Sequence, residues 1–253
     1  MSEEKIATPT PEEVKEEKIA TPILSTEAEK LLGEYKLGEY LSEGEFAQVW
    51  TLVASNLSDR VLKIQTIDRK EEEEGSDRPL GTEIKMAIKA GEMGVGPLIH
   101  GTLLEPIDGD HYMQYIVQDR LSGPTVDDLL PLITPEIVIS GLTLYHTLLS
   151  KGHIQGDLTA SNLMYNKDRL YLIDYGFGNT SDEWEQWEAK DMETEFPRHC
   201  GAMREAMEGQ VKRLLSSISG KFRRNKSSTP VTKEIRATLV KAAEEWMSKT
   251  FPP

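Results

Sequence analysis

Cysteine is nearly absent from this sequence, with Cys200 the one example among 253 residues. A single thiol cannot close a disulfide within the chain, so a disulfide-stabilised scaffold is excluded and a reducing compartment is expected. No apolar run approaches the roughly 20 residues that a membrane-spanning helix needs. The first residues are acidic and polar, which argues against a secretory signal peptide. We therefore expect a cytoplasmic protein, with the nucleus as an additional location.

Basic residues are in the minority: 29 Lys and Arg stand against 43 Asp and Glu, for a formal net charge of -14 at pH 7. Such a chain is not expected to bind nucleic acid over its whole surface, because phosphate binding depends on positive charge. The segment 212–226 differs from the rest, since it contains Lys and Arg but no acidic residue. It is either a local contact for nucleic acid or an acidic partner, or a solvated helix end.

Residues 1–30 do not have the composition of a folded segment. The string Glu-Glu-Lys-Ile-Ala-Thr-Pro occurs at 3–9 and again at 16–22. Stretches rich in Glu, Lys and Pro bury too little apolar surface to offset the entropy lost when the chain becomes ordered. We expect a disordered acidic tail here, with a partner-binding role for the repeat as the alternative.

The sequence that follows predicts an α+β architecture with two lobes. Residues 31–118 form a β-rich first lobe, with strands expected at 40–41, 46–53, 60–64, 97–104 and 112–118. Apolar side chains at helical spacing predict one helix over 80–92, and Gly94-Val95-Gly96-Pro97 is expected to end it.

Residues 119–226 form the second, mostly helical lobe, and 227–253 form a C-terminal extension. A helix is expected to start at Thr125, and a longer one to start at Thr134-Pro135, with Thr as the N-cap. The segments 163–165 and 171–173 are expected to pair as a short hairpin. A final amphipathic helix over 231–249 packs on the domain or docks a partner, through the stripe Ile235, Leu239, Ala242 and Trp246.

Two short motifs carry the chemistry. Residues 155–162 read Gln-Gly-Asp-Leu-Thr-Ala-Ser-Asn and supply Asp157 and Asn162, and 172–176 read Leu-Ile-Asp-Tyr-Gly and supply Asp174. Phosphoryl transfer needs a carboxylate that orients an acceptor hydroxyl, and hard oxygen ligands that hold Mg²⁺ against a polyphosphate. The hairpin returns Asp174 towards Asn162, so both oxygens can reach one ion. Gly176 is expected to let the chain turn tightly after Asp174.

These two motifs together resemble the catalytic loop and the metal-binding loop of protein kinases. A loop Asp and an Asp-Tyr-Gly turn would explain either motif alone. The resemblance implies a minimal bilobal protein-kinase-like fold, with ATP and Mg²⁺ as cofactors. It also implies a strand lysine that binds the phosphates and pairs with a helix glutamate, and the matching residues here are Lys63 and Glu83. Asp157, Lys63 and Glu83 are thus the expected catalytic residues, and Asn162 and Asp174 the expected metal ligands.

The same resemblance implies the remaining nucleotide contacts. The glycine loop has Ser42, Gly44 and Ala47 in place of three glycines, with Phe46 expected over the phosphates and Val49 against adenine. The segment 115–123 resembles the kinase hinge. Gln118 is the expected gatekeeper, and backbone groups from Asp119 to Leu121 are expected to bind adenine.

Residues 35–226 resemble the small atypical kinase subunit of the KEOPS (EKC) complex. The sequence of residues 156–162 is one basis of this resemblance. The other is the lack of a long activation segment, since only residues 177–190 separate Gly176 from Asp191. Asp191 is expected to accept hydrogen bonds from the catalytic loop. The resemblance implies a serine/threonine kinase that behaves largely as an ATPase. It also implies a threonylcarbamoyl transferase as partner, a role in tRNA modification, and tRNA contact through 212–226.

The chain departs from this family at both ends and once in the catalytic centre. Gln155 stands where the family has a histidine that supports the metal loop, and acidic residues 71–74 replace a basic stretch. Two other functions stay open. A small-molecule phosphotransferase of the aminoglycoside or choline kinase type shares the motif, although Gly176 and Gly178 speak against it. A non-catalytic nucleotide-binding scaffold is the other, although the complete set of polar residues weighs against it.

Overall fold

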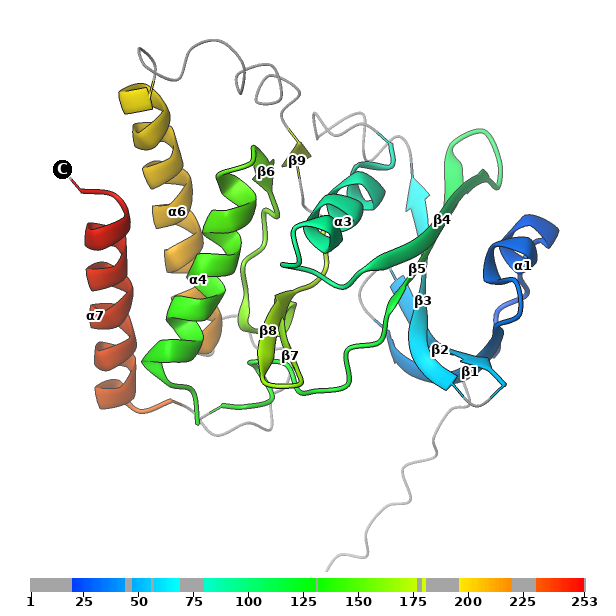
Figure 1. Ribbon diagram of the computed structural model, residues 1–253, viewed down its shortest axis with the longest axis horizontal. Coiled ribbons are helices and arrows are strands. Elements are labelled where there is room, and N and C mark those ends of the chain that lie inside the picture. Colours follow the sequence, from blue (N-terminus) through cyan, green and yellow to red (C-terminus); the bar gives the residue numbers. More distant parts are fainter. Residues whose placement is uncertain are drawn as a thin grey trace, which may run out of the picture.

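A five-stranded antiparallel sheet, in the order β1-β2-β3-β5-β4, forms the first lobe of the computed structural model (Figure 1). The structure describes residues 20–43, 47–55, 57–68, 80–130, 132–176, 179–180, 196–219 and 231–252. The strands of this sheet are β1 (Lys36–Glu43), β2 (Ala47–Ala54), β3 (Leu57–Asp68), β4 (Ile99–Pro106) and β5 (His111–Asp119). Every strand expected in this sheet is present; β1, β3 and β5 extend beyond the expected bounds at both ends, whereas β4 begins and ends two residues later than expected.

The helix α3 (Thr82–Glu92) lies between the sheet and the second lobe (Figure 1). It buries Met86, Ala87 and Ala90 in the core of the second lobe. Gly94, with φ of 65°, makes the turn after it, as a residue without a Cβ can do at little cost. The prediction of this helix and of its glycine-bearing end is confirmed.

The other face of the sheet is covered by α1 (Thr26–Leu32), which corrects the expectation of a disordered tail up to residue 30. Ser25 caps this helix by accepting a hydrogen bond from Ala28 N at 3.0 Å, and its hydroxyl donates to Glu105 on β4 at 2.6 Å. Ala28 and Leu32 are buried against the sheet. Composition missed this helix because its stability comes from packing against β4 rather than from its own apolar content.

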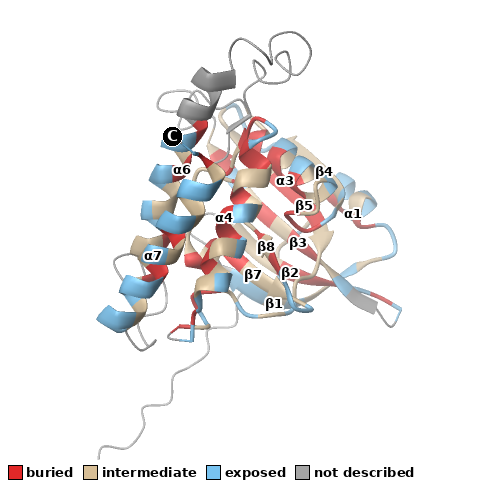
Figure 2. Ribbon diagram, turned by 60° about the vertical axis from the view of Figure 1, so that its left-hand side comes forward, coloured by how far each residue is buried: buried red, intermediate tan, exposed pale blue. Residues whose placement is uncertain are grey.

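The second lobe is built from helices around a short hairpin. Its elements are α4 (Pro135–Leu149), β6 (His153–Ile154), the 3-10 turn η1 (Ala160–Asn162), β7 (Leu163–Asn166), β8 (Arg169–Leu172), β9 (Asn179–Thr180), α6 (Phe196–Ile218) and α7 (Lys233–Thr250). The hairpin β7–β8 turns at Lys167 and Asp168, both with positive φ. Buried residues of the helices face inward and exposed residues face outward (Figure 2). The α+β fold with two lobes is therefore as predicted, and it is compatible with a small bilobal kinase-like fold.

Residues 125–130 do not form the helix that the sequence analysis expects. They make successive turns, and Val126 N and Asp127 N donate to the carbonyl oxygens of Leu163 and Ala160, at 2.8 and 3.2 Å. Leu129 N and Leu130 N donate to the third residue back, to Val126 O and Asp127 O at 3.2 and 3.5 Å. The segment therefore forms successive turns held against the β7–η1 region instead of an α-helix.

The extension helix α7 packs on the domain against α4, which is one of the two alternatives considered for it. Leu239 and Ala243 are buried in the core of the second lobe. Near the end of the chain, the ring of His146 on α4 lies 5.9 Å from Trp246 and 5.4 Å from Phe251, both edge-on. None of the helices within the described ranges is long and apolar enough to span a membrane.

The histidine in this aromatic cluster predicts that stability falls in mild acid. Burial lowers the pKa of His146 below its ordinary value. The neutral ring is thus favoured in the folded state, so its contribution is complete above the unfolded pKa of about 6.5 and is lost as the pH falls through the folded pKa. We expect the thermal midpoint to drop between pH 7 and pH 5, and His146→Phe to flatten that drop.

Thermal unfolding followed by circular dichroism across this pH range checks the prediction. The matched control is His111→Phe, because the Asp108 carboxylate raises the pKa of the exposed His111. That shift has the opposite sign, so its contribution is lost as the pH rises and this variant should keep the acid-induced drop. An unchanged acid limb in His146→Phe would contradict the prediction.

Candidate active site

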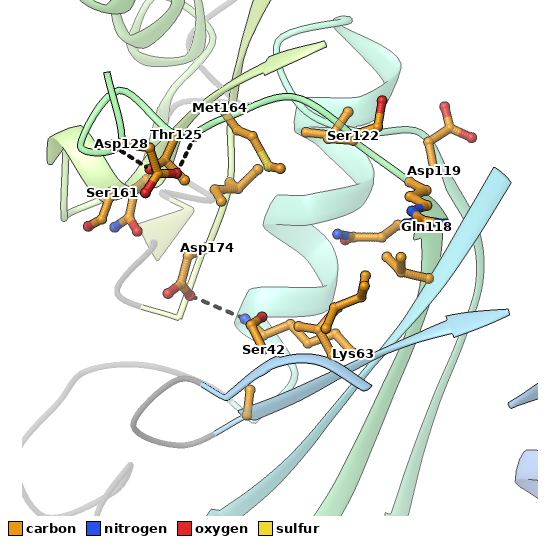
Figure 3. A pocket seen from close by; sticks show the side chains of 18 of the residues that line it. Ser42, Lys63, Gln118, Asp119, Ser122, Thr125, Asp128, Ser161, Met164 and Asp174 are labelled. Atoms are coloured by element: carbon orange, nitrogen blue, oxygen red, sulfur yellow. Dashed lines mark hydrogen bonds and ion pairs between the residues drawn. The ribbon is translucent and has the colours of Figure 1, made fainter. Parts of the chain in front are cut away.

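A cleft of about 750 Å³ is lined by residues of the sheet and of the second lobe (Figure 3). The sheet contributes apolar side chains on one side, and the segment after η1 contributes apolar side chains on the other: Leu41, Ala47, Val49, Val61, Met164 and Ile173. The chain segment 118–122 forms a polar edge. A slot with two apolar walls and a polar backbone edge suits a planar heteroaromatic ring.

Most of the nucleotide-binding residues expected from the sequence line this one cleft. They are Val49, Lys63, Gln118, Asp119, Leu121, Asn162 and Asp174. Gly44 and Phe46 of the glycine loop lie outside the described residues. Val61, Met164 and Ile173 were not singled out from the sequence, although alternation along a strand next to Lys63 is a signal that identifies Val61.

The backbone at the polar edge is partly occupied by bonds within the protein. Asp119 N donates to Leu98 O at 2.9 Å, and Arg120 N donates to Asp59 O at 2.7 Å. Two N–H groups of the segment expected to bind adenine are therefore engaged within the protein. Within the described ranges, the Leu121 N–H is the donor of this segment that has no partner.

Lys63 is the centre of a charged cluster at the inner end of the cleft. Its ammonium group forms ion pairs with the Glu83 carboxylate and with Asp174 Oδ1, the latter at 3.2 Å (Figure 3). Glu83 also accepts a hydrogen bond from Gln114 Nε2 at 2.9 Å. Burial on its own would lower the pKa of Lys63, but the Glu83 and Asp174 carboxylates together raise it above its ordinary value. The Lys63 ammonium group therefore stays positively charged at physiological pH.

Asn162 and Asp157 are joined within the catalytic loop. Asn162 Nδ2 donates to the backbone oxygen of Asp157 and to its Oδ2, both at 2.9 Å, and Asn162 is 2% exposed. These bonds use the nitrogen of the amide and leave its oxygen for another group. Asp157 itself does not line the cleft, and its Oδ1 accepts a hydrogen bond from Arg213 Nη1 at 2.9 Å.

Gln155 connects the catalytic loop to the loop that holds Asp174. Its Nε2 donates to the carbonyl oxygens of Asp174 and Ile173, at 2.8 and 3.3 Å, and its Oε1 accepts from Asp157 N at 3.1 Å. The side chain is fully buried. The Gln155 amide therefore donates to one loop through its nitrogen and accepts from the other through its oxygen. These bonds fix the position of Asp157 relative to Asp174.

The positive φ of the metal-binding motif belongs to Asp174, whereas Gly176, which is expected to let the chain turn after Asp174, lies in a turn without positive φ. Asp174 has φ of 61°, in the left-handed region, whereas Gly176 is not among the glycines with positive φ. Aspartate tolerates this conformation better than most residues because its short side chain can bond locally. Gly176 has room for a Cβ, which would lie 3.6 Å from Asp174 Oδ1.

Three side chains of α6 hold the catalytic loop, and the sequence analysis did not identify them as a group. Gln210 Oε1 accepts from Leu158 N at 3.0 Å, and Ser217 Oγ accepts from Ala160 N at 2.9 Å. Arg213 lies between them on the same helix face and pairs with Asp157. Their spacing of three and four residues is a signal for one shared face. Asp191, which was expected to accept the loop's hydrogen bonds, lies outside the described residues.

A divalent metal ion fits the donor set at Asn162 and Asp174. Both residues line the cleft and carry hard oxygen atoms: Asn162 has an amide oxygen and Asp174 has a carboxylate. The Asp174 side chain is 35% exposed. In the described part of the chain, no three His, Cys, Asp or Glu side chains converge on one point. This arrangement suits Mg²⁺, which commonly uses one or two protein ligands together with substrate phosphate oxygens.

Comparison with known proteins gives one partial similarity. No protein-family model matches the chain. A segment of 100 residues is 34% identical to a probable bifunctional tRNA threonylcarbamoyladenosine biosynthesis protein of Methanocorpusculum labreanum. This segment is 39% of the present chain and 17% of that protein's length.

Proposed function

We propose that this chain is an ATP- and Mg²⁺-dependent phosphotransferase, which acts as an atypical serine/threonine protein kinase or as an ATPase. One observation carries the proposal: Lys63, Asn162 and Asp174 line one cleft, and Asp157 is hydrogen-bonded to Asn162 beside it. A buried lysine held between two carboxylates at the inner end of a cleft is typical of a functional site. The apolar slot next to this cluster suits the adenine ring.

Each residue has a role that follows from its contacts. The Lys63 ammonium, held by Glu83, would bind α- and β-phosphate oxygens. Asn162 and Asp174 would hold Mg²⁺, which neutralises phosphate charge when bound. Asp157 would orient an acceptor hydroxyl or water and take its proton. The acceptor oxygen then bonds to the γ-phosphorus while the bond from this phosphorus to the β–γ bridging oxygen breaks, and ADP leaves.

A link to tRNA modification is the finer part of the proposal. It is supported by the similarity to a probable bifunctional tRNA threonylcarbamoyladenosine biosynthesis protein. A threonylcarbamoyl transferase-like subunit would be the protein partner, and residues 212–226 would contact tRNA. Of that segment, Arg213 is engaged with Asp157, so tRNA contact would rest on its other basic residues.

Nucleotide hydrolysis and self-labelling by purified protein test the proposal. We expect wild type to bind Mg-ATP and release phosphate or label itself. Asp157→Ala should lower turnover about 1,000-fold while keeping nucleotide affinity, and Asp174→Ala should lower turnover by at least that factor, since metal binding is lost too. The control is Glu244→Ala, which removes an exposed carboxylate from α7. Equal background turnover in wild type and all variants would refute an enzymatic role, and nucleotide binding without turnover would favour a scaffold.

A further inference from the structure

The catalytic loop has no positive charge of its own. Residues 155–162 contain neither Lys nor Arg. Phosphoryl transfer spreads negative charge over the oxygens of the moving group, and phosphotransferases place cations there. Lys63 is occupied at the inner end of the cleft by Glu83 and Asp174. A second cation next to Asp157 must therefore come from another element.

Arg213 on α6 brings such a cation to Asp157. Its Nη1 lies 2.9 Å from Asp157 Oδ1, while the other carboxylate oxygen, Oδ2, accepts from Asn162. Each oxygen of the Asp157 carboxylate thus accepts a hydrogen bond, one from Arg213 and the other from Asn162. Asp157 is 20% exposed and the Arg213 side chain 50% exposed, so the guanidinium lies at the open side of the pair.

The Arg213 guanidinium has N–H groups that are not used in its bond to Asp157. It carries five N–H groups in a rigid plane, and the bond to Asp157 uses one of its nitrogens. Within the described ranges, Arg213 makes no other hydrogen bond. Its helix is anchored on both sides by Gln210 and Ser217, which bond to the loop at Leu158 and Ala160. The charge is therefore held in place relative to the loop, although the side chain is half exposed.

From this geometry we infer that Arg213 is an active-site residue of the proposed phosphotransferase. It holds the Asp157 carboxylate in orientation and donates its remaining N–H groups to the phosphoryl group as that group moves to the acceptor. The inference rests on the proposed function and adds a residue to it. A segment expected to contact tRNA thus supplies one cation to the reaction instead.

Two measurements on Arg213→Ala test this inference, and the first does not depend on turnover. Affinity for ADP alone should stay within about threefold of wild type, whereas affinity for ADP with aluminium fluoride, which mimics the moving phosphoryl group, should fall about 30-fold. In turnover, kcat should fall about 100-fold with KM for ATP nearly unchanged. Methylguanidinium at millimolar concentration should restore part of the turnover of Arg213→Ala but none of Asp157→Ala.

Arg204→Ala is the matched control, because it removes the same guanidinium, about equally exposed and also paired with a carboxylate, from another part of α6. It should change neither affinity nor kcat. Equal loss of affinity for ADP and for ADP with fluoride, or loss of turnover without rescue, would overturn the inference in favour of a structural role for Arg213. Wild-type turnover in Arg213→Ala would overturn it while the proposed function stands. Failure of the wild type to bind any nucleotide would refute the proposed function itself.

Discussion

Replacement of Lys63 by methionine is expected to lower the free energy of unfolding by about 3 kcal/mol and to abolish turnover. Lys63 is 14% and Glu83 8% exposed, so their ion pair is buried. Removal of the ammonium takes the counter-charge from the Glu83 carboxylate, which keeps the hydrogen bond from Gln114 Nε2. A buried charge without its counter-charge costs several kcal/mol, more than the intact pair contributes. Urea unfolding measures this loss.

A double replacement separates the stranded charge from the missing lysine. Lys63→Met with Glu83→Gln removes both charges, so most of the lost stability should return while turnover stays absent. Lys89→Met is the matched control, since Lys89 forms an exposed pair with Glu92 at 3.5 Å. Exposed pairs contribute little, and we expect a change below about 0.5 kcal/mol. Equal losses at the two lysines would contradict the burial argument.

The strands were predictable because their signal is local. Short strand-forming segments, separated by turn residues, mark the sheet within residues 36–68 and 99–119, and Gly94 marks the end of α3. The helix α1 and the turns at 125–130 were missed because distant partners decide them. Ser25 bonds to Glu105 across 80 residues, and Val126 bonds to the β7 strand. No window of sequence contains such contacts.

The candidate site divides in the same way. Asp157, Asn162 and Asp174 lie in two short motifs whose spacing is visible in the sequence. The hairpin between the motifs brings Asn162 and Asp174 to one cleft, and Asp157 is hydrogen-bonded to Asn162 beside it. Gln210, Arg213 and Ser217 lie 52 to 57 residues beyond the groups they bind, so only the packing of α6 reveals them. The positive φ of Asp174 was likewise hidden, because the neighbouring glycine was the more obvious candidate for the turn.

Replacement of Gln155 should show that its amide nitrogen is the group that matters in the catalytic centre. Gln155→Glu keeps the acceptor for Asp157 N but places an oxygen against the carbonyl oxygens of Ile173 and Asp174. Two hydrogen bonds in a fully buried place become repulsions, so we expect the free energy of unfolding to fall by about 3 kcal/mol. Turnover should fall about 100-fold, because Asp174 shifts relative to Asp157.

Gln155→His gives the opposite expectation. A histidine can donate one ring N–H to the Asp174 carbonyl, so it should keep turnover within about tenfold of wild type, in line with the histidine that the KEOPS resemblance implies at this position. The control is Gln210→Glu, which keeps the acceptor oxygen for Leu158 N at 3.0 Å and loses only a long bond of 3.5 Å from Nε2 to Gly156 O. Unfolding in urea and phosphate release measure all three variants. If Gln155→Glu and Gln210→Glu lose similar stability and turnover, the Gln155 amide nitrogen is dispensable. If Gln155→Glu alone loses both, that nitrogen couples the two loops and has the role expected of the histidine.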